Sequence, residues 1–327
     1  MSTQPLDGLG ASAQPLDLLV VGDVNPDLIV RAEDARPVFG QAETLVDSAT
    51  LTIGSSAAIV ACGAARLGLR TALIGKVGDD LFGRFMLEEL RGRGVDTGGC
   101  VVSERSATGI SVILTQPHDR AILTYRGALA ELRYDDIDKT YLQRARHLHV
   151  SSLFLLDGLR GDLPRLFLDA KSLGLSTSLD TNWDPAGEWG LELESTLAHV
   201  DVLFPNEAES LRLTGAATVD EALAVLDEHG ALSVVKLGAK GSVAQRRGER
   251  HAAPPLSVDA VDTTGAGDSF VAGFLFGHRH GWDVATSLRF ASVCGSLSTR
   301  AAGGTAAQAT EAEAHGALAR LGLNSPV

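Results

Sequence analysis

The chain has 327 residues, of which 45% are hydrophobic, and a formal net charge of -13 at pH 7. This length suits one large domain with a sizeable core, and the acidic balance argues against nucleic acid and anionic membrane as partners. No apolar run approaches the length of a membrane span. Three scattered cysteines outside any CxxC pair indicate a reducing cytoplasm rather than a zinc site. The predicted ligands are therefore small molecules.

The start of the chain predicts a tail followed by a buried strand. Residues 1–15 have no basic start and no apolar stretch, which predicts a loose tail rather than a signal peptide. An apolar run over 16–21 predicts the first strand. Asn25 and Asp27 follow it, at the strand end that faces the ligand cleft of an open parallel sheet. Asp27 there can bind two hydroxyl groups of a ligand, or Asn25 and Asp27 form an ordinary Asx turn around Pro26.

Two β-rich segments, 28–52 and 101–125, interrupt an otherwise alternating β/α pattern. The second contains a predicted hairpin turn at His118–Asp119. We expect the two segments to pair into one small sheet, and a lid of this kind excludes water from a cleft.

Small residues over 54–68 predict a closely packed helix that ends at a glycine. Its start, Gly54, Ser55 and Ser56, can present N–H and hydroxyl groups to a ligand, or serve tight packing alone. Further on, Asp79 and Asp80 stand where they would cap a helix.

The middle of the chain alternates between strands and helices, with strands predicted at 147–152, 175–179, 200–204 and 232–237. This alternation predicts a mostly parallel sheet wrapped in helices. Asn206 and Glu209, three apart at a helix start, orient Mg²⁺-bound water or form a helix cap; the spacing fits both. The turn from Gly238 to Gly241 lets a nucleotide lie against backbone, with Lys240 near its phosphates.

The stretch from Asp262 to Phe270 predicts an anion cradle at the start of a helix. Gly265, Ala266 and Gly267 leave the backbone bare, and N–H groups at a helix start bind anions. Asp268 would be repelled by a bound phosphate unless it removes a proton from the attacking group. A helix cap is the alternative, but a cap does not require Gly-Ala-Gly.

This nonapeptide closely resembles the C-terminal signature of the ribokinase-like (PfkB-type) sugar and nucleoside kinases. Residues 54–68 resemble the family's N-terminal signature, except that Ser55 replaces a glycine and Ile59 replaces an Asn that often contacts the sugar. The string at 77–83 and the Asn-x-x-Glu pattern also match. The resemblance spans about residues 16 to 320, and it departs from the family at Lys236, where Thr is common.

The resemblance implies a three-layer α/β/α kinase domain over 16–325 that carries the lid. The reaction it implies passes the γ-phosphoryl group of ATP to a hydroxyl of a small neutral sugar. Asp268 acts as general base beside the anion hole of Gly265, Ala266 and Gly267. The implied sugar-binding residues are Asn25, Asp27, Gly54, Ser55, Ser56 and Asp268. The implied ATP-binding residues are Asn206, Lys236, Gly238, Lys240, Gly241, Gly267 and Ser292. Mg²⁺ is held through water by Asn206 and Glu209.

The resemblance also suggests a potassium ion behind the cradle, held by the Asp262 carboxylate, by the backbone carbonyls of Asp262 and Thr264, and by carbonyls from the loop around Ser298, Ala301 and Gly303. The alternative is that Asp262 only caps the helix or bonds the neighbouring amides. A homodimer through the lid is the further partner that the resemblance allows.

Other readings are weaker. The Gly-x-x-x-x-Gly-Lys-Ser/Thr motif of P-loop kinases is absent, and Gly265-Ala-Gly267 comes too late for a dinucleotide-binding motif. A non-catalytic sugar sensor would have lost Asp268 or the cradle. A nucleoside kinase and a sugar-phosphate kinase stay open as alternatives; the latter needs a cation aimed from the lid, for which the candidates are Arg31, Arg105, Arg120 and Arg126.

Overall fold

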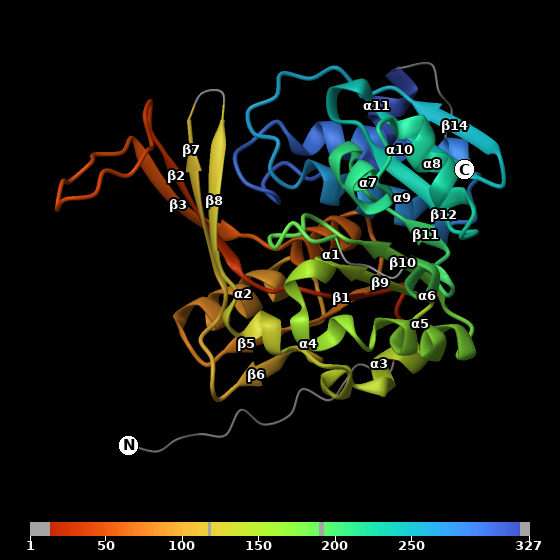
Figure 1. The fold of residues 1–327 in the computed structure, drawn as a ribbon, viewed down its shortest axis with the longest axis horizontal. Helices are drawn as coiled ribbons and strands as arrows, with labels where there is room; N and C mark the ends of the chain where they lie inside the picture. Colours follow the sequence, from red (N-terminus) through yellow and green to blue (C-terminus); the bar gives the residue numbers. More distant parts are fainter. Residues whose placement is uncertain (1–13, 117–118, 190–192, 321–327) are drawn as a thin grey trace.

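The computed structural model describes residues 14–116, 119–189 and 193–320. An eight-stranded sheet in the order β14-β13-β12-β11-β10-β9-β1-β4 lies at its centre (Figure 1). The strands from β12 to β4 in this order run parallel, and β13 and β14 add an antiparallel edge. The strands are β1 (Leu18–Val21), β4 (Thr71–Ile74), β9 (His147–Ser151), β10 (Ser176–Asp180), β11 (Val202–Leu203), β12 (Leu232–Lys236), β13 (Ser242–Arg246) and β14 (Glu249–Ala253).

Helices cover both faces of this sheet, because strand side chains point alternately to either side. Leu18 and Val20 of β1 belong to one core cluster, whereas Leu19 and Val21 belong to another. The first cluster is covered by α1 (Ser56–Arg66), α2 (Leu81–Gly92), α9 (Ala266–Arg279), α10 (Val284–Ser298) and α11 (Glu311–Arg320). The second is covered by α3 (Lys139–Arg144), α4 (Asp157–Arg160), α5 (Leu163–Ser172), α6 (Leu193–Leu197) and α8 (Val219–Asp227). The predicted three-layer α/β/α architecture is confirmed.

Element boundaries differ modestly from the prediction. Helix α10 begins at Val284, because the Asp283 side chain caps it by accepting from the Thr286 amide at 2.7 Å. Helix α7 (Glu207–Thr214) and short 3₁₀ turns complete the chain: Gly127–Glu131, Tyr134–Asp136, Leu153–Leu155 and Gly238–Lys240. No helix in the described part of the chain combines the length and hydropathy needed to cross a membrane.

A second, four-stranded sheet stands beside the main body in the order β3-β2-β7-β8 (Figure 1). It is called the lid sheet below. Its strands are β2 (Pro26–Arg31), β3 (Ser48–Ile53), β7 (Ile110–Thr115) and β8 (Arg120–Tyr125). The small β-rich sheet was therefore predicted correctly, but not its limits. Strand β2 begins at Pro26, and residues 32–47 contain no strand. Residues 101–103 form β6 (Val101–Ser103), which pairs with β5 (Lys76–Gly78) outside the lid sheet. Asp119 immediately precedes β8, whereas His118 lies outside the described residues.

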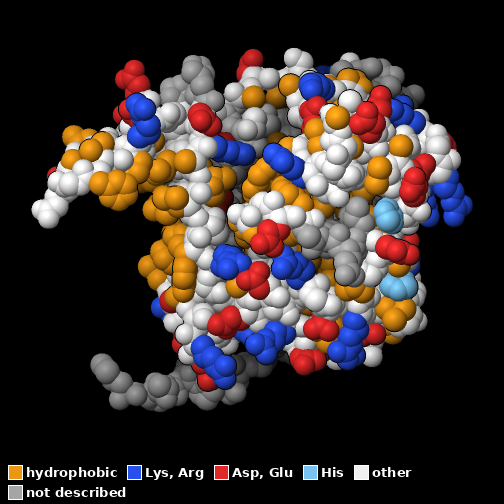
Figure 2. All heavy atoms as spheres, viewed as in Figure 1, with side chains coloured by type: hydrophobic (Ala, Val, Ile, Leu, Met, Phe, Trp, Pro, Cys, Tyr) orange, Lys and Arg blue, Asp and Glu red, His pale blue; other side chains and the backbone are white. Residues whose placement is uncertain are grey.

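The two faces of the lid sheet differ in chemistry. One face turns to the main body and carries three aligned rows: Asp27, Ser111 and Thr124; then Ile29, Ile113 and Ile122; then Arg31, Thr115 and Arg120. The opposite face consists of nonpolar residues, and Figure 2 shows hydrophobic side chains gathered on this side of the molecule. They are Leu28, Val30, Ala49, Leu51, Val112, Leu114, Ala121, Leu123 and Tyr125. The inner face of the lid sheet therefore changes from a polar row through an isoleucine row to a row with two arginines, whereas the outer face is nonpolar throughout.

Candidate active site

The anion cradle lies where two glycine-containing segments cross. Gly265 caps α9 with φ 70°, a left-handed conformation that favours glycine. A Cβ added to Gly265 would lie 2.7 Å from the Cα of Gly304, so the backbones touch. The amides of Gly267 and Asp268 follow in the first turn of α9, where helix geometry supplies no acceptor and the dipole is positive.

Asp268 projects from this first turn toward the start of α1. Its Oδ1 accepts a hydrogen bond from Ser56 Oγ at 2.5 Å, and Ser56 Oγ also lies 2.8 Å from Ser151 Oγ at the end of β9. Burial raises the pKa of Asp268 to about 7; the nearby Asp180 carboxylate adds to the rise, while Ser56 and Lys236 oppose it. A carboxylate with a pKa near neutrality suits general base catalysis.

Lys236, at the end of β12, brings a positive charge to the cradle. Its ammonium forms an ion pair with Asp180, at the end of β10, and both side chains are largely buried. Burial opposes the charge on Lys236, but Asp180 and Glu209 together raise its pKa above the ordinary value. A Cβ added to Gly267 would lie 3.7 Å from Lys236 Nζ, so the ammonium borders the cradle directly.

Asn206 and Glu209 form the capping arrangement that their spacing allowed. The Glu209 carboxylate accepts from the Asn206 amide N at 2.8 Å and from Nδ2 at 2.6 Å, while Asn206 Oδ1 accepts from the Glu209 amide at 2.9 Å. Burial raises the pKa of Glu209 to about 7, against the effect of Lys236. The cap does not exclude the magnesium role. Mg²⁺ keeps most of its waters and takes one or two protein oxygens plus phosphates, a demand that one buried carboxylate beside an amide fits.

The predicted sugar-binding residues converge at the base of the lid sheet. Asp27 lies on β2 rather than in a turn, and a Cβ on Gly54 would stand 2.1 Å from its Oδ1, so the carboxylate needs a glycine there. Burial raises the pKa of Asp27 to about 7, with Asp23 adding and Arg120 opposing. Beside it, Asn25 Oδ1 is buried without a hydrogen-bond partner among the described residues. Both groups are therefore available to ligand hydroxyls.

The two departures from the family signature have structural consequences. Ser55 stands at φ 69°, where glycine would be unstrained, and its Oγ compensates by accepting from the Ala58 amide at 3.0 Å and donating to the Asp23 carbonyl at 2.5 Å. Ile59 is buried and packs against Gly304, since a Cβ there would lie 2.4 Å from its Cδ1. Ile59 thus supports the cradle from behind.

The structure does not gather all the predicted ATP-binding residues. Gly238 and Gly241 form the exposed turn after β12, with Gly241 at φ 90°. Lys240 points outward and pairs with Glu207 at 3.1 Å. Ser292 is buried in α10, where its hydroxyl lies 3.2 Å from Ser242 Oγ, so its side chain is engaged within the fold.

The Asp262 carboxylate, predicted to bind potassium, accepts hydrogen bonds with both of its oxygens. Asp262 Oδ1 accepts from the Thr264 amide at 2.9 Å and its Oγ1 at 2.7 Å, and Oδ2 accepts from the Gly303 amide at 3.0 Å and from Arg31 at 3.1 Å. Ser298 Oγ donates to the Gly295 carbonyl at 2.8 Å, and Gly303 approaches Asp262 with its amide N–H. The carboxylate is surrounded by donors, one of them a cation, which is the alternative that the sequence left open.

Sequence reasoning named Lys236 for ATP binding but missed Asp180 as its ion-pair partner. The only local signal for Asp180 was its position at the cleft end of a predicted strand.

Comparison with known proteins places this site in a family. The model of the pfkB family carbohydrate kinases matches residues 16–311. The 5-dehydro-2-deoxygluconokinase of Geobacillus kaustophilus is 31% identical over 318 residues, which cover 91% of this chain and 90% of that protein. Arabidopsis thaliana ribokinase, solved with ribose and ATP, superposes with a TM-score of 0.79 at 25% identity, covering 93% of this chain and 99% of that one. A putative ribokinase II from E. coli, solved with ATP and Mg²⁺, gives 0.81 at 24% identity, with 93% and 99% covered. Because the family model and these relatives match nearly the whole chain, including the anion cradle, the chain belongs to the pfkB family of carbohydrate kinases.

Proposed function

We propose that this kinase transfers the γ-phosphoryl group of ATP to a hydroxyl of a small neutral sugar, with Asp268 as the general base. The observation that carries the proposal is the position of Asp268 in the first turn of α9, hydrogen-bonded to Ser56 and with a pKa of about 7. A base poised near neutral pH takes a hydroxyl proton as the oxygen attacks phosphorus.

The remaining groups stabilise the transferring phosphoryl group and orient the sugar. Charge that develops on the transferring group is met by the Gly267 and Asp268 amides and by the Lys236 ammonium beside them. Asp27 and Asn25 accept hydrogen bonds from other sugar hydroxyls and so hold the attacking one in place. Asn206 and Glu209 would hold Mg²⁺ through water, and the ion would neutralise charge on the phosphates.

The nucleotide is proposed to lie along the turn from Gly238 to Gly241, whose bare backbone allows a close approach. We also propose that the reaction takes place in the cytoplasm, where ATP is available. Cys62, Cys100 and Cys294 are all free, as thiols are in a reducing compartment.

A sugar acid is the second candidate acceptor. Three of the lid-region arginines are engaged or lie elsewhere: Arg31 pairs with Asp262, Arg126 pairs with Asp157, and Arg105 lies outside the lid sheet, in the loop between β6 and β7. Arg120 forms no ion pair within the described ranges, and it lies on the inner face of the lid sheet. A guanidinium in this place fits a carboxylate, and one relative is named as a kinase of 5-dehydro-2-deoxygluconate.

A substrate screen tests the proposal. ADP release is measured with neutral pentoses and hexoses, sugar acids, nucleosides and sugar phosphates, using Asp268→Asn as the matched control. Turnover of neutral sugars that disappears in the control is the expected result. Preference for sugar acids, lost in Arg120→Ala, selects the second candidate, and no turnover with any acceptor contradicts the kinase assignment of this site.

We further propose that two copies associate through the outer faces of their lid sheets. Nonpolar side chains fill this face, and Leu123 and Tyr125 are 60% and 55% exposed, which favours burial against a matching surface. Light scattering should show a dimer for the wild type and a monomer for Leu123→Glu. Leu168→Glu, at an exposed position of α5, is the control. A monomeric wild type at assay concentrations contradicts this proposal.

A further inference from the structure

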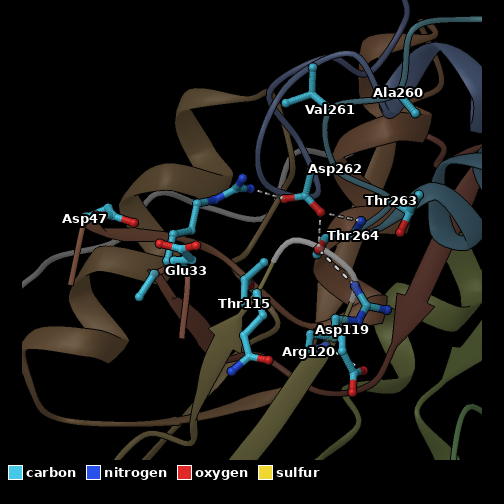
Figure 3. Close-up of a pocket in the computed structure, with 13 residues that line it drawn as sticks. Glu33, Asp47, Thr115, Asp119, Arg120, Ala260, Val261, Asp262, Thr263 and Thr264 are labelled. Carbon is cyan, nitrogen blue, oxygen red and sulfur yellow. Dashed lines mark hydrogen bonds and ion pairs between the residues drawn. The ribbon is translucent and has the colours of Figure 1, made fainter. Parts of the chain in front are cut away.

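Residues 260–264, called the cradle loop below, precede the anion cradle and are hydrogen-bonded to the end of the lid sheet that lies far from its base. Arg31, the last residue of β2, donates to Asp262 Oδ2 at 3.1 Å, and Arg120, the first of β8, donates to Thr264 Oγ1 at 3.2 Å. These contacts border a cavity of about 720 Å³ between lid and loop. Figure 3 shows Asp262 and Thr264 meeting these donors. The loop runs directly into Gly265, so its position sets that of the cradle.

Asp262 remains ionised in this setting. Burial alone would raise its pKa, but the amides of Gly303 and Thr264, the Thr264 hydroxyl and the Arg31 charge hold it below the ordinary value. Asp262 is thus a carboxylate held among neutral donors, and the Arg31 guanidinium is its cationic partner.

The other charged groups around this pair do not replace that role. Glu33, Asp47 and Asp119 line the same cavity and add negative charge, whereas Arg120 bonds a hydroxyl rather than the carboxylate. Among the described residues, Arg31 is the cation in direct contact with Asp262.

We propose that Arg31 is a built-in counterion for the cradle loop and takes the place that a monovalent metal ion would otherwise fill. Arg31 is then a positioning residue: it acts on the reaction through Asp262 and Thr264, without touching the substrate. Because Arg31 belongs to the lid sheet, the cradle loop is held only when the lid lies against the body. The enzyme should accordingly work at the same rate with or without potassium.

Thermal unfolding tests the site without turnover, so this arm does not depend on the proposed function. Melting temperatures are compared in potassium chloride and tetramethylammonium chloride of equal ionic strength. The wild type should melt at the same temperature in both salts. Arg31→Ala should melt lower in tetramethylammonium and regain part of the loss in potassium. A rise specific to potassium in the wild type would show that the ion binds despite Arg31, and would overturn the proposal.

Initial rates with the best acceptor form the second arm, which rests on the proposed kinase function. Wild-type rates should be indifferent to the exchange of salts. Arg31→Ala should lose on the order of tenfold in kcat, since a charge-assisted hydrogen bond to the loop is lost, and potassium should restore part of it. Arg31→Lys keeps the charge and should retain most activity.

Arg36→Ala is the matched control, because Arg36 is exposed and its ion pair within the described residues is with Asp34 of the same loop. A loss in Arg31→Ala that potassium does not restore, or rates equal to those of Arg36→Ala, would refute Arg31 as counterion. If no acceptor is phosphorylated, the result counts against the proposed function instead. The melting temperatures then test the role of Arg31 on their own.

Discussion

The pKa of Asp268 sets how the reaction rate should respond to pH. The base acts only as the carboxylate, and its pKa is about 7 because burial and nearby carboxylates disfavour the charge. Since kcat/KM reports the free enzyme, its logarithm should rise with pH at unit slope and level off above about pH 7. Between about pH 7 and pH 5 the ionised fraction falls from about one half to about one hundredth, so kcat/KM should fall about 50-fold.

Asp268→Asn isolates this titration, because the amide keeps the shape but cannot take a proton. We expect kcat to fall on the order of 10²–10⁴-fold, with sugar affinity largely kept and the acid limb of the profile lost. ADP release across pH and calorimetric sugar binding measure the two effects. Near-normal turnover refutes the role of base. An acid limb that persists with the same pKa assigns the titration to Asp27 or Glu209, whose pKa values are also about 7.

Three further substitutions probe the rest of the site. Asp27→Ala should weaken sugar affinity by roughly 1.5–3 kcal/mol and leave ATP affinity unchanged; equal damage to both would mean that Asp27 is structural. Gly265→Ala should lower the free energy of unfolding in urea by at least about 1 kcal/mol, because φ 70° is strained for alanine and its Cβ would meet Gly304; wild-type stability would contradict the crossing. Lys236→Met leaves Asp180 buried without its partner, so it should cost about 3–5 kcal/mol of stability and weaken ATP turnover; unchanged values of both would remove Lys236 from the site.

The sequence predicted those parts of the site that are local in the chain. Gly265, Ala266, Gly267 and Asp268 are contiguous, so the cradle and its helix follow from composition and helix-start geometry. The parallel sheet also followed, because strand and helix patterns alternate over long stretches.

Contacts between distant segments could not be predicted in this way. Lys236 and Asp180 lie 56 residues apart and end two strands that are separated in the sheet by β11, so their pairing depends on strand order. Arg31 and Asp262 lie 231 residues apart in the chain, and composition does not indicate that the two residues are in contact. For the same reason the sequence could not separate a metal ion from an arginine as the counterion of Asp262.

The alternation along β2 gives one short strand two separate tasks. Asp27, Ile29 and Arg31 face the cleft, whereas Leu28 and Val30 face outward. A scan of single substitutions along this strand should therefore show a period of two, with odd positions altering kinetics and even positions altering self-association. Deleting one residue would exchange the two faces. Point substitutions in β2 can thus change acceptor preference and assembly independently, whereas an insertion or deletion changes both at once. The length of this strand is therefore more constrained than its sequence.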